Sequence, residues 1–88
     1  MENSFSVGSR IKISDNYHWA KNATGIIIQP PNVIVEMSDG WKGNVREVKS
    51  LKGILLFYWV KFDEPQIDAD GDGPYQEAEI DSNFIIQN

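Results

Sequence analysis

The chain has 88 residues, of which 41% are hydrophobic and 24% charged, a composition typical of one globular domain and not of a disordered segment. It contains no cysteine, which excludes disulfides, thiolate metal sites and cysteine nucleophiles. The formal net charge is −5, and no apolar run is long enough to cross a bilayer. The first residues lack a basic, apolar signal segment, so we expect a single cytoplasmic domain over residues 1–88, with no membrane partner.

The predicted elements are almost all strands. Alternating or β-branched segments bounded by turn residues predict strands at residues 10–13, 24–29, 33–37, 45–49, 54–62 and 83–87. Pro65 is expected to end the fifth of these. No segment keeps apolar residues at helical spacing for more than about a turn. Five to six short antiparallel strands in a chain of this size favour a small all-β barrel, because closing a sheet removes its exposed edges.

The strand at residues 54–62 carries apolar side chains on both faces. The even set, Ile54, Leu56, Tyr58, Val60 and Phe62, is predicted to fill the barrel, because Lys61 marks the odd face as reaching water. The odd side chains then need cover. We expect residues 38–50 to supply it, and a symmetry mate or a partner is the alternative.

Four short segments carry a resemblance to a known fold. Residues 7–13 and 23–27 resemble the opening of an SH3-like barrel, and residues 58–63 and 78–80 fit its final strands. The arrangement is similar to photosystem I subunit IV and to the variable chain of ferredoxin–thioredoxin reductase. The resemblance implies an SH3-like barrel, here with a long acidic loop. It implies little about function, because this fold has many unrelated roles. The Ala-Leu-Tyr-Asp-Tyr run of peptide-binding SH3 domains is absent.

Charge is divided unevenly along the chain. Residues 1–61 hold all eight Lys and Arg against five acids, whereas residues 62–88 hold eight acids and no base. Such a local density of negative charge repels itself unless a cation or a basic partner neutralises it. It also disfavours nucleic acid, which requires a basic surface. The sequence therefore points to a protein partner with a basic surface.

The most distinctive acidic segment is residues 68–79. Read as a twelve-residue calcium loop, it places Asp68, Asp70, Asp72 and Glu79 at positions one, three, five and twelve, with the carbonyl of Pro74 at position seven. Two features oppose this reading, since a strand precedes the loop and Pro74 restricts the glycine before it. Calcium is thus an alternative ligand, and a solvated acidic loop is the other interpretation.

Catalysis is not expected. His18 is the only histidine and has no serine beside it in the sequence, so a nucleophile–base pair is not indicated. No glycine-rich phosphate loop is present either.

Loop aromatics complete the sequence-based hypothesis. Trp19, Trp41 and Tyr75 fall in predicted loops, where aromatic side chains are typical binding anchors or plugs for a barrel end. We therefore predict a non-catalytic interaction module in which these aromatics and the carboxylates of Asp68, Asp70 and Asp72 bind a basic partner. The alternatives are a calcium-binding domain and an inhibitor or immunity-type protein acting against a basic nuclease or toxin. A homodimer is also left open.

Overall fold

The computed structural model describes residues 4–88, and strands make up nearly half of them. The elements are, in chain order, β1 (Arg10–Ile13), β2 (Thr24–Ile27), α1 (Asn32–Met37), β3 (Trp41–Lys42), β4 (Val45–Ser50), β5 (Gly53–Gln66), β6 (Tyr75–Asp81), the 3-10 helix η1 (Ser82–Phe84) and β7 (Ile85–Gln87). Within residues 4–88, no helix is long and apolar enough to cross a membrane. The all-β class predicted from the sequence is confirmed.

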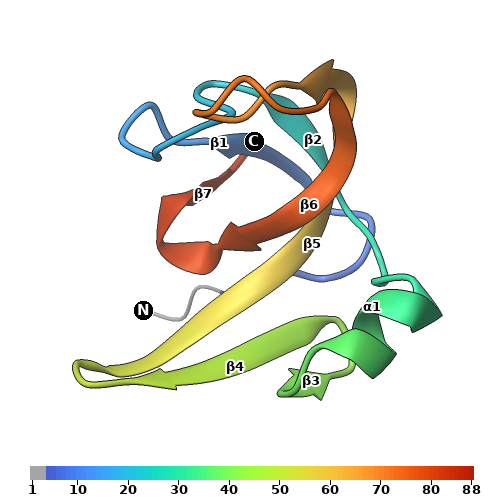
Figure 1. Cartoon of the computed structure of the whole chain (residues 1–88), viewed down its shortest axis with the longest axis vertical. Coiled ribbons are helices and arrows are strands. Elements are labelled where there is room, and N and C mark those ends of the chain that lie inside the picture. The colour runs from blue at the N-terminus through green and yellow to red at the C-terminus, as the bar shows by residue number, and fades with distance from the viewer. Residues whose placement is uncertain (1–3) are drawn as a thin grey trace.

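One sheet contains all of these strands, and β5 is its centre. The strand order is β3-β4-β5-β2-β1-β7, with β6 also paired to β5, and every pairing is antiparallel. The first half of β5 pairs with β4, and its second half pairs with β2 on one side and β6 on the other. Because β5 bends between these partners, the sheet curls into a half-barrel, and the β4–β5 hairpin extends away from it (Figure 1).

The core lies inside this curl, as the alternation in the sequence predicts. Tyr58, Val60 and Phe62 of β5 are buried, and they pack with the inward residues of the other strands, chiefly Ile11, Ile13, Ile27 and Ile80. The prediction is wrong at the start of β5, where Ile54 is 59% exposed and Leu56 only half-buried. That part of β5 belongs to the projecting hairpin, so its inward face has no barrel to fill (Figure 1).

The strand predicted at residues 33–37 is instead α1. The carbonyl of Pro31 accepts hydrogen bonds from the backbone N–H of Ile34 and Val35, at 3.0 and 3.2 Å, and so begins the helix. β-Branched residues favour strands, but a strand requires a free neighbouring edge. None of the strand pairings within residues 4–88 includes residues 33–37, so this segment has no partner strand in the sheet. None of the helix residues is buried.

Several predicted boundaries also differ from the structure, and β2 ends at Ile27 and not at residue 29. Pro65 does not end β5, which continues to Gln66. The β5–β6 register shifts between Lys61 and Gln66, so the missing N–H of Pro65 falls in an interrupted part of the ladder. At the other end of the chain, residues 82–84 form η1, and only Ile85–Gln87 is a strand. The carboxylate of Asp81 begins this helix by accepting the N–H of Asn83 at 2.9 Å.

Candidate functional site

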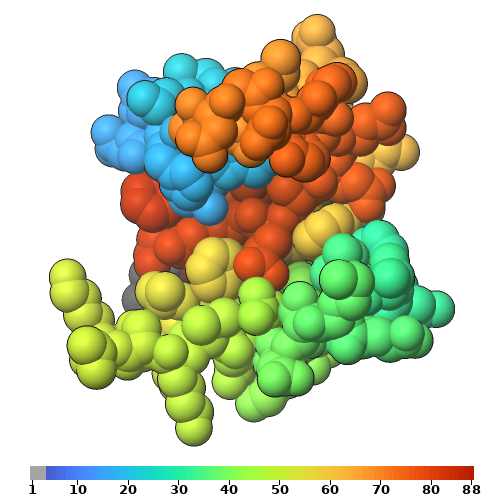
Figure 2. Space-filling view, in the orientation of Figure 1, coloured from blue at the N-terminus to red at the C-terminus, as the bar shows by residue number. Residues whose placement is uncertain are grey.

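Two loops far apart in the sequence meet at one end of the half-barrel. The first connects β1 to β2 over residues 14–23, and the second connects β5 to β6 over residues 67–74. Figure 2 shows them side by side, the first in blue and the second in orange, at the end opposite the β4–β5 hairpin. They enclose a pocket of about 310 Å³ lined mainly by His18, Trp19, Asp68, Asp70, Tyr75 and Ala78.

Trp19 forms the wall of the pocket nearest the core. Its ring meets that of buried Phe62 edge to face, with centroids 5.7 Å apart and planes at 81°. On the pocket side it meets Tyr75 in the same way, at 5.9 Å and 77°. Tyr75 begins β6 and remains 40% exposed. The two rings thus make a corner, with one side fixed to the core and the other open to solvent.

The first loop is held in shape by its own backbone and by Tyr17. The buried Tyr17 ring lies against Phe84 of η1, with 5.0 Å between centroids, and so ties this loop to the C-terminal part of the chain. Ala20 and Asn22 have positive φ, 51° and 64°, and the N–H of Asn22 returns to the carbonyl of Ile13 at 3.0 Å. Trp19 is therefore presented by a loop that is packed and hydrogen-bonded.

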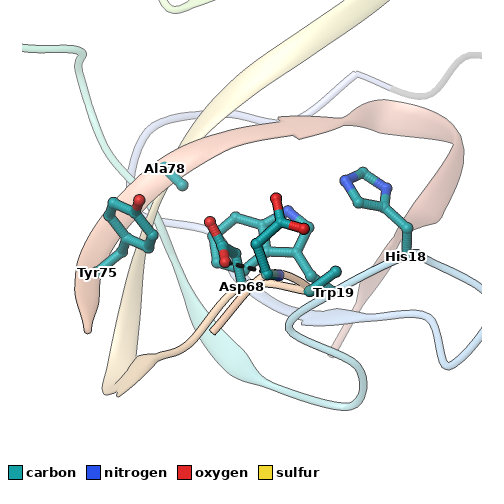
Figure 3. Close-up of a pocket in the computed structure, with 7 residues that line it drawn as sticks. His18, Trp19, Asp68, Tyr75 and Ala78 are labelled. Carbon is teal, nitrogen blue, oxygen red and sulfur yellow. Dashed lines mark hydrogen bonds between the residues drawn. The ribbon is translucent and has the colours of Figure 1, made fainter. Parts of the chain in front are cut away.

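The second loop is organised by Asp68. Its Oδ1 accepts the backbone N–H of Asp70 at 3.0 Å and that of Asp72 at 2.9 Å. The Asp68 N–H in turn donates to the carbonyl of Asp72 at 2.9 Å. Figure 3 shows Asp68 between Tyr75 and Trp19, with His18 at the end of the pocket opposite Tyr75. The sharp bend requires Gly73, whose φ is +122°.

The carboxylates of this loop form no ion pair with any Lys or Arg of residues 4–88. Carboxylate oxygens of Asp68, Asp70 and Asp72 lie within 4.8 Å of one another, and no Lys or Arg is among the residues that line the pocket. Loss of hydration raises the pKa of the Tyr75 hydroxyl, and the negative charges of Asp68 and Asp72 raise it further. The phenol is thus neutral at physiological pH, and the pocket is a region of negative potential.

The chain's two arginines are engaged elsewhere. Arg10 on β1 forms two hydrogen bonds with the Asp63 carboxylate, at 2.9 and 2.6 Å, and Thr24 donates to the same group at 2.6 Å. These contacts hold the pKa of Asp63 at about 2, mainly through the Arg10 hydrogen bonds and then that of Thr24. Asp63 borders a second, polar pocket of about 260 Å³. The network links β1, β2 and β5, and the pocket lies where the β1–β2 loop meets β2 and β5.

The calcium-loop ligand set is only partly assembled. Asp68, Asp70 and Asp72 come together as the spacing predicts, but Glu79 does not join them. Its carboxylate receives hydrogen bonds from Arg46 Nη1 at 3.0 and 3.1 Å on the outer face of the sheet. The physical reason is that residues 75–81 form β6, an extended strand that cannot return Glu79 to the loop. Pro74 is exposed at the end of the loop, after a cis bond to Gly73. The prediction that Glu79 is the twelfth-position ligand of a calcium loop is therefore wrong.

Trp41 is placed apart from the other two predicted anchors. It lies in β3 opposite Arg46 of β4 and does not line the pocket. Its Nε1 is buried and forms no hydrogen bond within residues 4–88. Trp19 and Tyr75 do lie together, so two of the three predicted aromatic anchors line the pocket. This separation follows from the β3–β4 pairing, which the sequence analysis did not predict.

Three residues that line the pocket, His18, Ala69 and Ala78, were not predicted as site residues. His18 precedes Trp19 in the same loop, and its ring lies against that of Tyr17 at a tilt of 55°, with 4.4 Å between centroids. Its adjacency to a predicted anchor was the available signal. Ala78 pairs with Val60 across β5 and β6, and its small side chain leaves room for the pocket. Nothing in the local sequence distinguishes this alanine.

No family model, curated protein or solved structure matches this chain.

Proposed function

We propose that this domain is a non-catalytic interaction module that binds a basic segment of a partner protein at the pocket between residues 14–23 and 67–75. The observation that carries the proposal is the combination of two aromatic walls with carboxylates that form no ion pair within the described residues 4–88. Aromatic side chains supply contact area at little entropic cost, and the carboxylates attract and orient a positively charged partner.

The rigidity of the two recognition groups, Trp19 and Asp68, supports this proposal. Trp19 is anchored on Phe62, and Asp68 is fixed by two backbone N–H groups, so both recognition groups are held before a partner arrives. A preorganised site loses less conformational entropy on binding than a mobile one. The partner class includes a basic nuclease or toxin, in which case the acidic loop acts as an inhibitor.

The experiment is peptide selection with a matched charge control. Displayed random nonapeptides are selected against the immobilised domain and against a variant carrying Asp68→Asn, Asp70→Asn and Asp72→Asn. Asparagine keeps an oxygen for the N–H groups that Asp68 accepts. The control variant carries Glu36→Gln, Asp39→Asn and Glu64→Gln, which removes the same charge from exposed positions outside the pocket.

The expected result is enrichment of Lys- and Arg-containing peptides on the wild type and the control variant, and loss of that enrichment on the loop variant. Binding of the selected peptides weakens as salt is raised, because the attraction between charges is screened. Equal enrichment on all three proteins, or none on the wild type, would contradict the proposal.

A divalent cation is the second candidate ligand, favoured by the three carboxylates within 4.8 Å. It predicts that calcium, and not magnesium, raises the melting temperature of the wild type, because a ligand that binds only the folded state stabilises it. The loop variant would lose this effect. A wild type whose melting temperature is the same with and without millimolar calcium would eliminate this candidate.

A further inference from the structure

We propose that the pocket receives one lysine side chain of the partner, with its ammonium group, bare or N-methylated, between Trp19, Tyr75 and Asp68. This inference rests on the proposed function and specifies its ligand. It depends on the shape of the aromatic corner, the acceptor geometry of Asp68 and the size of the pocket.

The corner suits a compact cation. The Trp19 and Tyr75 rings touch edge to face, at 77° with centroids 5.9 Å apart, so a group in the angle where their two faces meet lies near both rings. An ammonium ion within about 6 Å of an aromatic face is attracted by the ring quadrupole. A guanidinium is planar, and it gains most from a ring parallel to its own plane. Rings at nearly right angles favour the rounder ammonium.

Asp68 offers the ammonium a single hydrogen-bond acceptor. Its Oδ1 already receives the N–H groups of Asp70 and Asp72, so its two oxygens are not both free for a paired interaction. Arginine binds a carboxylate best through two parallel hydrogen bonds, one to each oxygen. An ammonium can bind through a single hydrogen bond to one oxygen. Asp70 lies on the exposed rim, and its carboxylate forms no hydrogen bond or ion pair within residues 4–88. As an exposed residue of the pocket lining, it can attract the ammonium as it enters.

The pocket is large enough to receive a lysine side chain. The volume of about 310 Å³ is near the lower end of the roughly 300–1,000 Å³ found for small-molecule sites. Ala78 of β6 borders the pocket with only a methyl group. The methylene stem of a lysine can lie along Trp19 while its charged end stays near the carboxylates and water, which is how long cationic side chains usually pack.

The test is an NMR titration of the isotope-labelled domain with four blocked amino acids. The probes are the Nα-acetyl methylamides of lysine, Nε-trimethyllysine, arginine and norleucine, the last being a neutral match for the lysine stem. The readouts are the Trp19 indole N–H and the Ala78 amide, with the Trp41 indole as an internal reference outside the pocket. The expected result is saturable shifts at Trp19 and Ala78 with one or both lysine forms, at least fivefold tighter than with arginine or norleucine.

Matched variants tie the response to the pocket. Asp70→Asn is expected to weaken lysine binding at least threefold, whereas Glu36→Gln, which removes the same charge from α1, leaves it unchanged. Tyr75→Phe keeps the ring and retains binding, whereas Tyr75→Ala loses it. Since Tyr75 is 40% exposed, both variants are expected to fold, and a wild-type-like amide spectrum checks this.

Two results would overturn the inference. Shifts that are equal for norleucine and lysine would remove the charge requirement, and tighter binding of arginine would reassign the ligand. If no probe binds but the nonapeptide selection still enriches basic sequences, the lysine pocket is wrong and the interaction function stands. If both experiments fail, both proposals are wrong.

Discussion

Trp19 lies edge to face on Phe62, with 5.7 Å between ring centroids, so a wall of the surface pocket is also part of the packing of the half-barrel. Phe62 belongs to the buried core of β5, and Trp19 is the half-buried residue that covers it. Recognition and stability are therefore coupled at this position.

Replacing Trp19 tests that coupling. Trp19→Ala removes the cover of Phe62 and is expected to lower the free energy of unfolding by about 2 kcal/mol, below the range for fully buried aromatics because Trp19 is only half-buried. Trp19→Phe keeps a ring and is expected to cost about 1 kcal/mol. Urea denaturation at neutral pH measures both. Leu51→Ala is the control, since Leu51 is fully exposed at the hairpin tip and its removal is expected to change little. A Trp19→Ala variant as stable as Leu51→Ala would show that the contact contributes nothing.

The Arg10–Asp63 pair predicts a specific acid dependence. The Asp63 pKa of about 2 lies below its ordinary 3.8, so its contribution to stability is present above about pH 4 and is lost as pH falls through about 2. Arg10→Gln removes the main cause and is expected to return the Asp63 pKa towards 3.8. Carboxyl carbon shifts followed by NMR from pH 6 to pH 1.5 measure this value directly. Thr24→Val, which removes the weaker hydrogen bond, should produce a smaller rise. An unchanged Asp63 pKa in Arg10→Gln would disprove the assignment.

The acidic loop should also control the ionisation of Tyr75. Removing negative charge favours the phenolate, so the variant with Asp68→Asn, Asp70→Asn and Asp72→Asn is expected to have a lower Tyr75 pKa than the wild type. The pKa should stay above its ordinary 10.0, because loss of hydration, the largest cause, remains. Alkaline titration of tyrosine absorbance, with Tyr75→Phe subtracted to isolate this residue, gives the measurement. The charge-matched variant of Glu36, Asp39 and Glu64 should leave the Tyr75 pKa at the wild-type value.

Gly73 offers a test of the loop geometry. At φ +122° an alanine is strained, and its Cβ would lie 3.0 Å from the carbonyl oxygen of Gln66. Gly73→Ala is therefore expected to lower the free energy of unfolding by about 2 kcal/mol. Gly71 is the matched control, because it also has positive φ, +85°, but nothing lies within 4 Å of a Cβ built there. Gly71→Ala is expected to cost about 1 kcal/mol. Equal losses for the two variants, measured by thermal or urea unfolding, would show that the close approach to Gln66 is unimportant.

The sequence predicted those strands in which buried and exposed side chains alternate clearly within the segment itself. Residues 10–13 alternate clearly, and the second half of β5 buries the predicted even set, because one face of each lies against the core. Residues 33–37 are also rich in β-branched side chains, yet they form α1, because strand formation depends on a partner strand that no local pattern reveals. β3, at Trp41–Lys42, is too short to give a periodic signal.

The pocket was predicted in its parts and not in its assembly. Trp19, Tyr75, Asp68 and Asp70 were all chosen from the sequence, on the grounds that loop aromatics and clustered carboxylates bind ligands. That these four meet, while Trp41 and Glu79 lie elsewhere, depends on contacts between loops about fifty residues apart. Strand pairing across β5 determines those contacts, and a spacing rule taken from helical calcium loops could not foresee it.

The two carboxylates of the pocket differ in how freely they can be exchanged. Asp68 holds the backbone of its loop, so replacing it by an apolar residue would alter the shape of the pocket together with its charge. Asp70 has no such duty, and its substitution would change the attraction for a ligand while the loop keeps its path. Selection for a new ligand, in nature or in the laboratory, should therefore accumulate changes at positions 70 and 75 and leave position 68 untouched.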